Sequence, residues 1–174
     1  LAPLMLSSAL AIKLTSRGPV FFTQPRLGVD GKVFHVYKFR TMTVHQEHGV
    51  VTQATRDDAR VTRIGGFLRR TSLDELPQLF NVLAGEMSLV GPRPERPYFV
   101  DQLTQQIPFY AVRHCVKPGV TGWAQVRYQY GASVDDAAEK LQFDLYYVKN
   151  HSLILDTLVL FETVRVVLTG EGAH

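Results

Sequence analysis

The residues with the clearest chemical potential are two adjacent carboxylates set among arginines. Asp74 and Glu75 follow Arg69 and Arg70 closely, and Arg93 comes soon after them. A phosphorylated substrate repels a lone carboxylate, but arginines and a divalent cation can absorb that negative charge and let the carboxylate attack phosphorus. The pattern is therefore compatible with a nucleophilic carboxylate that acts on a phosphate ester.

The same dyad has a structural alternative. Residues 72–75 match the capping box S-x-x-E, in which the acids only stabilise the start of a helix. Pro77 fits the first turn of a helix but not its interior, so the dyad is expected at or just before a helix N-terminus. Capping and catalysis are compatible there, because the free N–H groups of a helix start favour ionised carboxylates and bind anions.

Arg93 lies between Pro92 and Pro94, directly after Gly91. Each proline fixes its φ angle, so this backbone is rigid and suits a side chain that must be aimed. A guanidinium can hold phosphate through two hydrogen bonds, which an ammonium cannot do. The alternative is a solvated arginine in a proline-rich helix stop.

Two more cations and a pair of histidines offer further sites. Lys38 and Arg40 alternate along a strand and would share a face, either toward a phosphate or at a solvated edge. His45 and His48 have no clear third ligand, so a zinc site is disfavoured. Oxygen ligands from Glu75 and from substrate phosphates would instead suit Mg²⁺.

The elements that must position these residues are mostly helical. A β-hairpin is predicted between residues 19 and 42, with its turn at residues 28–31, and a mobile loop over residues 43–62. Helical signals follow in five segments, which cover residues 64–70, 76–83, 97–105, 135–150 and 153–168. This order of one hairpin followed by helices predicts an α+β fold.

Composition narrows the class of protein. The 174 residues are 45% hydrophobic and 20% charged, which suits one globular domain. The formal net charge of +3 favours anionic partners without choosing among them. A basic nucleic-acid-binding domain, which would use scattered arginine and aromatic contacts and bind with a steep salt dependence, is a disfavoured alternative. Cys115 is the single cysteine, so no internal disulfide can form and a cytosol-facing protein is favoured.

Both ends of the chain are apolar. Residues 1–14 carry no charge before Lys13 and would rise only about 20 Å as a helix, too little to cross a bilayer core. They are interpreted either as a buried N-terminal helix or as the returning half of a membrane helix that breaks at Pro3. Residues 153–168 have a wide apolar arc, which fits either core packing or a helix in the membrane interface.

Six segments, in this order, resemble the bacterial sugar transferases, the monotopic polyprenyl-phosphate phosphoglycosyl transferases. They are residues 18–22, GPVFF; 38–42, KFRTM; 69–78, RRTSLDELPQ; 87–94, MSLVGPRP; 117–125, KPGVTGWAQ; and 143–147, FDLYY. The resemblance implies a catalytic domain over residues 15–174, preceded in residues 1–14 by the remnant of a re-entrant membrane helix. The family helix usually breaks at Ser-Pro, where this chain has Ala2-Pro3.

The resemblance also assigns roles to the candidate residues. Asp74 would attack the β-phosphorus of a UDP-sugar, releasing UMP and leaving a covalent phosphosugar that undecaprenyl phosphate collects. Glu75 would hold Mg²⁺. Substrate phosphates would be contacted by Arg69 and Arg93, with Lys38, Arg40 and Asp144 as further parts of the pocket.

A membrane-associated enzyme that begins exopolysaccharide or glycan assembly is thus expected. Its partners would be a UDP-sugar, undecaprenyl phosphate and membrane lipid, with no nucleic acid, and a homo-oligomer is compatible with this reading. Its place would be the cytoplasmic face of the bacterial inner membrane. The alternative is a non-catalytic member of the same fold that binds nucleotide or lipid phosphate and scaffolds a polysaccharide assembly.

Overall fold

The structure is a computed structural model that describes residues 1–43, 58–128 and 133–169. The described α-helices are α1 (Ala2–Thr15), α2 (Arg63–Arg70), α3 (Gln78–Leu83), α4 (Pro97–Gln106), α5 (Trp123–Arg127), α6 (Val134–Asn150) and α7 (Leu153–Thr169). The strands are β1 (Phe21–Leu27), β2 (Val33–Phe39), β3 (Ser88–Val90) and β4 (Gly119–Thr121). Short 3₁₀ turns are η1 (Val29–Gly31), η2 (Leu73–Glu75) and η3 (Tyr110–Cys115). The predicted α+β class is confirmed.

The predicted hairpin is confirmed. Strands β1 and β2 pair antiparallel, from Phe21 opposite Phe39 to Leu27 opposite Val33. Asp30 and Gly31 reverse the chain with φ angles of 54° and 71°, a left-handed conformation that asparagine, aspartate and glycine adopt most readily. The hairpin forms from residues close in sequence, so the local pattern of apolar and turn residues was enough to predict it.

A second sheet was not predicted. Strands β3 and β4 pair in parallel, with Ser88 opposite Gly119 and Val90 opposite Thr121. The two backbones approach so closely that a Cβ on Gly119 would lie 2.1 Å from the nitrogen of Gly91. Glycine is required at this contact, because any larger residue would push the two strands apart.

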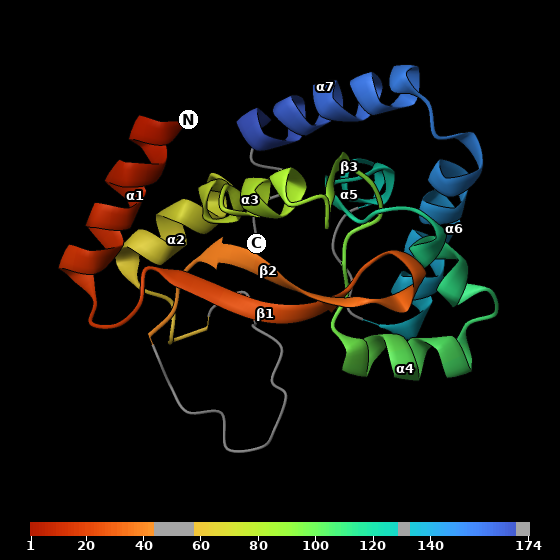
Figure 1. The fold of residues 1–174 in the computed structure, drawn as a ribbon, viewed down its shortest axis with the longest axis horizontal. Coiled ribbons are helices and arrows are strands. Elements are labelled where there is room, and N and C mark those ends of the chain that lie inside the picture. Colours follow the sequence, from red (N-terminus) through yellow and green to blue (C-terminus); the bar gives the residue numbers. More distant parts are fainter. Residues whose placement is uncertain (44–57, 129–132, 170–174) are drawn as a thin grey trace.

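The hairpin runs across the middle of the molecule and the helices surround it (Figure 1). Helix α3 and turn η2 contact β2, whereas α4 contacts β1. Helix α1 lies at one end against α2, and α7 packs over α5 and the small parallel sheet. The dyad on η2 is therefore held between the hairpin and the helical layer.

Small apolar clusters fix this arrangement. Ile12 of α1 packs with Phe39 and Leu68, which ties the N-terminal helix to the hairpin and α2. Val159 of α7 is fully buried against Val90 and Tyr147. Each terminal helix thus buries one side in the domain, while other apolar side chains on both helices remain exposed.

The predicted loop and the predicted membrane segments can be compared with the structure only where residues are described. Most of the loop predicted over residues 43–62 lies outside the described residues, as do His45 and His48. Its two ends are joined, since the Thr43 N–H donates to Arg60 and the Thr62 N–H to Thr41. Along the described part of the chain, no helix combines the length and the apolar character needed to cross a membrane.

Candidate active site

Asp74 and Glu75 form a 3₁₀ turn just before α3, as the position of Pro77 predicts. The capping-box alternative is wrong, because the Ser72 side chain makes no capping hydrogen bond and its backbone is left-handed, with φ of 54°. Helix α3 begins at Gln78, two residues later than predicted. The two acids therefore form no capping box with Ser72, and each has its own surroundings in the turn.

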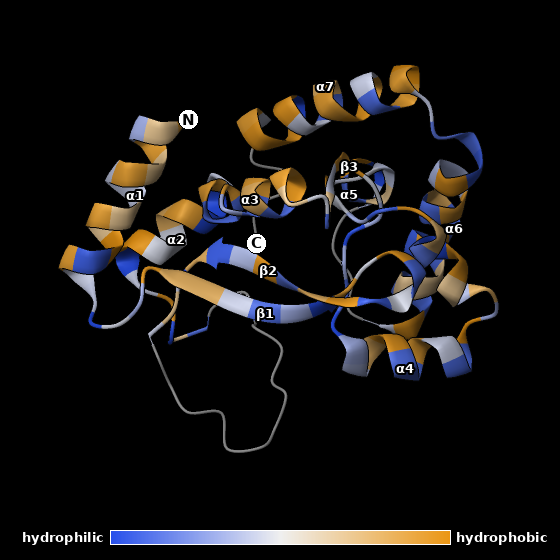
Figure 2. Cartoon of the chain, viewed as in Figure 1, coloured by the Kyte–Doolittle hydropathy of each residue, from blue (hydrophilic) through white to orange (hydrophobic). Residues whose placement is uncertain are grey.

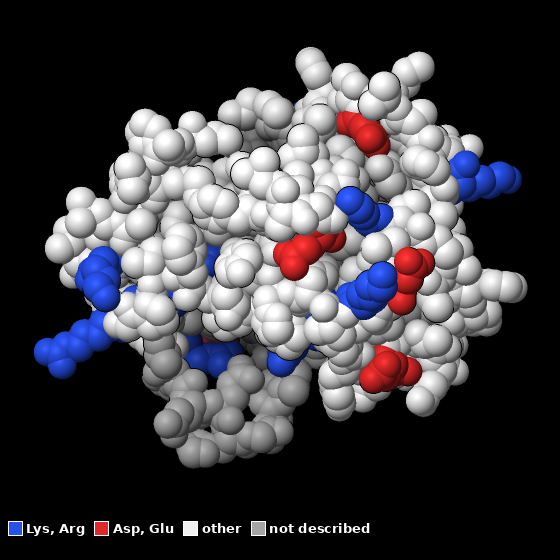
Figure 3. All heavy atoms as spheres, in the orientation of Figure 1, with Lys and Arg blue, Asp and Glu red and all other residues white. Residues whose placement is uncertain are grey.

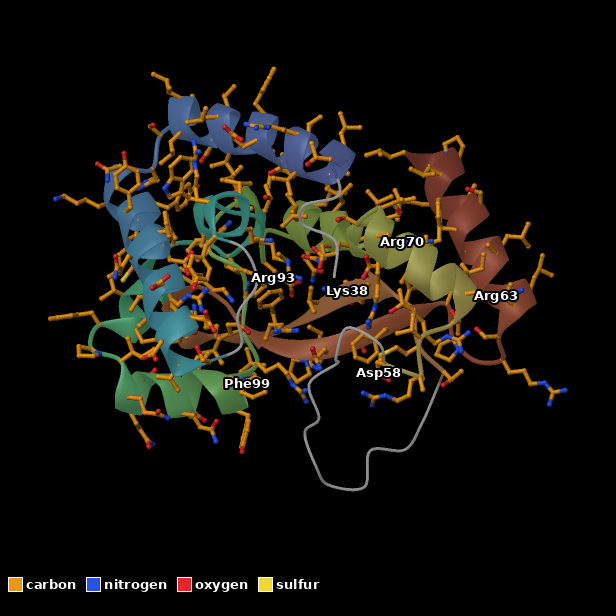
Figure 4. The ribbon with its side chains drawn as sticks, turned by 180° about the vertical axis from the view of Figure 1, so that it is seen from behind. Lys38, Asp58, Arg63, Arg70, Arg93 and Phe99 are labelled. Atoms are coloured by element: carbon orange, nitrogen blue, oxygen red, sulfur yellow. The ribbon has the colours of Figure 1, made fainter. Side chains whose placement is uncertain are left out.

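Glu75 is the centre of a cation cluster. Its Oε1 accepts a hydrogen bond of 2.6 Å from Lys38 Nζ on β2. Both terminal nitrogens of Arg93 donate to the same carboxylate, one to Oε1 and the other to Oε2 at 3.3 Å. The Glu75 side chain is 18% exposed, so this charge balance is partly shielded from water. Lys38 and Arg93, both labelled in Figure 4, lie together over the hairpin.

The two carboxyl groups have opposite electrostatic surroundings. Burial raises the pKa of Asp74 to about 6, with help from the negative charge of Glu75 and against the pull of Lys38, Arg93 and Arg69. For Glu75, burial alone would raise the pKa, but Arg93 and Lys38 outweigh it and hold the pKa well below its usual value. Two acids with separated pKa values next to cations are typical of a catalytic site.

The segment that carries Arg93 is fixed by hydrogen bonds to four successive carbonyl groups. The carbonyls of residues 92, 93, 94 and 95 accept, in that order, from Gly119 N–H at 3.0 Å, Arg113 at 2.9 Å, Arg26 at 3.1 Å and Leu27 N–H at 3.0 Å. The donors come from the hairpin, η3 and the start of β4. Because they hold the segment from different elements, the direction of the Arg93 side chain is set by the whole fold.

Asp144 acts behind this segment rather than in the cation cluster. It lies on α6, is 2% exposed and pairs with Arg113 at 2.8 Å. Arg113 also donates to the Tyr110 hydroxyl at 2.7 Å. Burial alone would lower the pKa of the Arg113 guanidinium, but Asp144 beside it raises the pKa. Asp144 was predicted as part of the phosphate pocket, but it reaches Glu75 only through Arg113 and Arg93.

Of the remaining predicted cations, Arg69 lies near Asp74 and Arg40 does not join Lys38. Arg69 donates from Nε to the Thr41 hydroxyl at 3.0 Å, and its charge acts on Asp74. Arg40 does not join Lys38: it is buried and donates to the main-chain carbonyls of Ser16 and Arg17. The alternation that predicted a shared face ends with β2 at Phe39, so Arg40 leaves the strand and holds the link after α1.

Two residues that the sequence analysis missed line a cavity with this cluster. Arg26 and Gln78 surround it together with Val36, Lys38, Arg93 and Pro94. Burial lowers the pKa of Arg26 to about 10. Gln78 follows Glu75 by three residues, which is the spacing of neighbours on one helix face. That spacing was the available signal for Gln78, whereas Arg26 had none beyond its place on β1.

A divalent cation fits Glu75 only with help from a substrate. Glu75 supplies an ionised carboxylate beside Asp74, the type of ligand that Mg²⁺ takes. Within residues 1–43, 58–128 and 133–169, no group of three His, Cys, Asp or Glu residues could hold a metal. Phosphate oxygens and water would have to complete the coordination, which is common for Mg²⁺ in phosphate-transfer sites.

Comparison with known proteins shows the family of the chain. A family model described as bacterial sugar transferase matches residues 1–170. The chain is 52% identical to a UDP-N-acetylgalactosamine-undecaprenyl-phosphate N-acetylgalactosaminephosphotransferase of Aeromonas hydrophila, over 99% of this chain and 41% of that protein. It is 49% identical to the UDP-glucose:undecaprenyl-phosphate glucose-1-phosphate transferase of Escherichia coli K12, over 100% of this chain and 38% of that protein. An exopolysaccharide production protein of Rhizobium leguminosarum is 44% identical, over 99% of this chain and 90% of that protein. The chain thus spans about two fifths of the first two relatives.

Proposed function

Since the chain belongs to the bacterial sugar transferase family, we propose that it transfers a sugar-1-phosphate from a UDP-sugar to undecaprenyl phosphate. The products are an undecaprenyl-diphosphate-sugar and UMP, and the reaction begins the assembly of an exopolysaccharide or another glycan. The names of the relatives from Aeromonas hydrophila and Escherichia coli support these substrates. The name of the Rhizobium relative supports the exopolysaccharide context.

The observation that carries the proposal is the buried carboxyl of Asp74 beside the cluster of Glu75, Lys38 and Arg93. Its pKa of about 6 leaves the carboxylate form predominant at neutral pH. Lys38 and Arg93 are positioned to receive a phosphate, since both side chains already bind an anionic group in Glu75. A nucleophile of this kind next to anion-binding side chains suits displacement at phosphorus.

In the proposed reaction, a carboxylate oxygen of Asp74 forms a bond to the β-phosphorus of the UDP-sugar. The bond from that phosphorus to the bridging oxygen of the diphosphate breaks, and UMP leaves with the electron pair. An oxygen of undecaprenyl phosphate then attacks the same phosphorus, the bond to Asp74 breaks and the carboxylate is regenerated. Two displacements replace one encounter between two anionic substrates.

Glu75 would supply the protein ligand of Mg²⁺ in this site. When bound, Mg²⁺ would neutralise charge on the diphosphate and on the departing UMP. Lys38 and Arg93 would pass from Glu75 to phosphate oxygens as substrate enters. Arg69, held by Thr41, would keep further positive charge near Asp74.

We further propose that the domain lies on the cytoplasmic face of the bacterial inner membrane, with residues 1–14 as the returning half of a re-entrant helix. Large apolar side chains are exposed on α1, α3 and α7, and Figure 2 shows the hydrophobic colouring of α1 and α7. They are Leu4, Leu6, Leu10, Leu14, Phe80, Leu83, Leu153, Ile154, Leu158, Leu160, Phe161, Val164, Val167 and Leu168, and Leu1 just before α1 is exposed as well. In Figure 3, the upper surface over α1 and α3 carries few charged atoms. Such surfaces can bury themselves in one leaflet without crossing it.

The test is release of UMP from UDP-N-acetylgalactosamine and from UDP-glucose, with and without undecaprenyl phosphate. The wild-type chain should release UMP, and its intact mass should rise by one phosphosugar when the lipid is left out. Asp74→Asn should abolish both signals, because an amide is a very poor nucleophile. An active Asp74→Asn variant would rule out the covalent route, and no UMP release from either sugar would contradict the proposal for these two substrates.

A further inference from the structure

Gln78 is almost fully buried, and its unpaired carboxamide keeps some access to a cavity. The residue is 2% exposed and begins α3. Among residues 1–43, 58–128 and 133–169, its carboxamide makes no hydrogen bond, and the polar side-chain atoms there that are both fully enclosed and unpaired belong to Arg40, Arg113 and Gln125. Buried amides in native proteins are nearly always hydrogen-bonded to protein or to water, because an amide that loses its hydrogen bonds to water without replacing them costs free energy. The Gln78 amide is therefore unpaired but not sealed off, and it can form a hydrogen bond to a group that enters the cavity it lines.

The surroundings define the chemistry of that partner. Gln78 lines a cavity of about 10 Å³ with Arg26, Lys38 and Arg93, which is room for about one water-sized group. Arginine and lysine only donate hydrogen bonds. Three cations around one small space favour an oxygen that carries negative charge, and hydrogen bonds to such an oxygen are stronger than those to neutral water.

We propose that Gln78 binds substrate by donating a hydrogen bond from its side-chain amide to a non-bridging phosphate oxygen. The inference deepens the proposed function and rests on it, since the phosphate belongs either to the UDP-sugar or to undecaprenyl phosphate. Gln78 thereby becomes a binding residue next to the nucleophile. Its neutral amide adds one more directed donor beside the guanidinium groups of Arg26 and Arg93.

Gln78 is rigidly connected to the dyad. The Leu76 N–H donates to Leu73 and the Leu79 N–H donates to Leu76, so successive turns run from η2 into α3. Pro77 between them is buried and has a restricted φ angle. A phosphate oxygen held by Gln78 would therefore be fixed relative to the carboxylate of Asp74, which is the requirement for an in-line attack.

The test compares Gln78→Leu with wild type in UDP binding, in UMP release and in thermal unfolding. Leucine has a similar size but no polar atoms, so the melting temperature should stay the same or rise, because no internal hydrogen bond is lost. The dissociation constant for UDP with Mg²⁺, or KM for undecaprenyl phosphate, should increase about tenfold or more. Gln125→Leu is the control, since this part-buried glutamine donates to Val120 and does not line the cavity. It should leave both constants within about twofold of wild type.

The two substrate arms identify the phosphate. A weaker UDP affinity with unchanged KM for undecaprenyl phosphate assigns Gln78 to the nucleotide diphosphate, and the reverse assigns it to the lipid phosphate. Gln78→Glu should weaken binding more than Gln78→Leu, because a carboxylate in the cavity would compete with phosphate for the cations. If wild type is active and Gln78→Leu changes neither constant, the inference is overturned. If wild type releases no UMP, the proposed function fails instead, and unchanged binding of inorganic pyrophosphate by Gln78→Leu would then overturn the inference separately.

Discussion

At the scale of single residues, the negative charges of the neighbours Asp74 and Glu75 have opposite effects on the stability of the fold. Asp74 is 8% exposed and its raised pKa means that ionising it opposes folding. Glu75 has a lowered pKa, so its negative charge supports folding by pairing with Lys38 and Arg93. The chain therefore keeps a destabilising charge at the position proposed for the nucleophile, which is a common compromise between stability and activity.

Asp74→Asn should stabilise the metal-free protein at neutral pH. The acid has an ordinary pKa of 3.8 and a folded-state pKa of about 6, so the folded state binds the proton more tightly. The penalty is absent below pH 4, grows as pH rises to 6 and is full above that, at about 2–3 kcal/mol. Urea unfolding in EDTA at pH 7.5 and pH 3.5 would measure it. Equal gains at both pH values would show that the charge of Asp74 is not the cause.

Glu75→Gln should destabilise the protein at neutral pH. Loss of the Glu75 negative charge leaves Lys38 and Arg93 without their shared anion in a partly buried site. We expect this to lower the free energy of unfolding by about 2–3 kcal/mol. Because the folded-state pKa is lowered, this stabilisation is present above the ordinary value of 4.5 and disappears only in stronger acid. The same variant should weaken the dependence of UMP release on Mg²⁺.

Glu86→Gln is a suitable control for the effect on Mg²⁺, since Glu86 pairs with Asn81 and not with Lys38 or Arg93. It should leave the Mg²⁺ titration of UMP release unchanged. An unchanged titration in Glu75→Gln as well would remove Glu75 as the metal ligand.

At the scale of elements, the segment around Arg93 shows how a rigid backbone aims a flexible side chain. Pro92 and Pro94 fix two φ angles, and the carbonyls of residues 92–95 are each held by a different donor. Arg113 contributes a side chain to this set and is itself held by Asp144. The element thus transmits the position of α6 to the cation cluster at Glu75.

Arg113→Gln should therefore impair catalysis by misplacing Arg93. We expect kcat/KM for UMP release to fall about tenfold to a hundredfold, with Arg113→Lys recovering part of the loss. In an Arg93→Gln background the further loss should be small, because the two changes act through one contact. Arg96→Gln is the control: Arg96 stacks on Phe99 and is not among the donors to residues 92–95. Losses that simply multiply in the double variant would contradict a role through Arg93.

The sequence predicted local features of these elements better than distant ones. The hairpin and the dyad before Pro77 depend on neighbours in the chain, and both are confirmed. The pairing of β3 with β4 joins three-residue strands far apart in sequence, which no periodic pattern can reveal. Arg40 was grouped with Lys38 because strand alternation was extended one residue past the end of β2. The partner of Asp144 was invisible because Arg113 comes from another element.

At the scale of the whole molecule, the cation cluster around Glu75 and the exposed apolar side chains of α1 and α7 belong to one small domain. Helix α7 uses Val159 and Leu155 to pack on the core, while Ile154, Leu158 and Phe161 remain exposed. Helix α1 divides its residues in the same way around Ile12. The two terminal helices therefore attach to the domain by narrow faces and leave apolar faces exposed, which are the faces proposed to contact lipid.

Replacing Ile154, Leu158 and Phe161 with serine should reduce co-flotation of the chain with liposomes of bacterial lipids. The three side chains are 84%, 43% and 80% exposed, so the melting temperature should change little while lipid binding falls. Val159→Ser is the contrasting control, since this residue is fully buried and its loss should destabilise the fold. Unchanged flotation of the triple variant would place the membrane contact elsewhere.

The parallel contact between β3 and β4 also bears on the order of folding. Strands separated by about 30 residues pair late, because a long loop must close before the contact stabilises the chain. Since Gly119 of β4 also holds the carbonyl of Pro92, the direction of Arg93 should be set only in that late step. A refolding chain would pass through a stage that has its hairpin and much of its helix but not the ordered cluster of Arg93, Lys38 and Glu75. Trp123, the single tryptophan, directly follows β4 and Gly122, so its fluorescence should report this step after the far-UV signal of the helices has already returned.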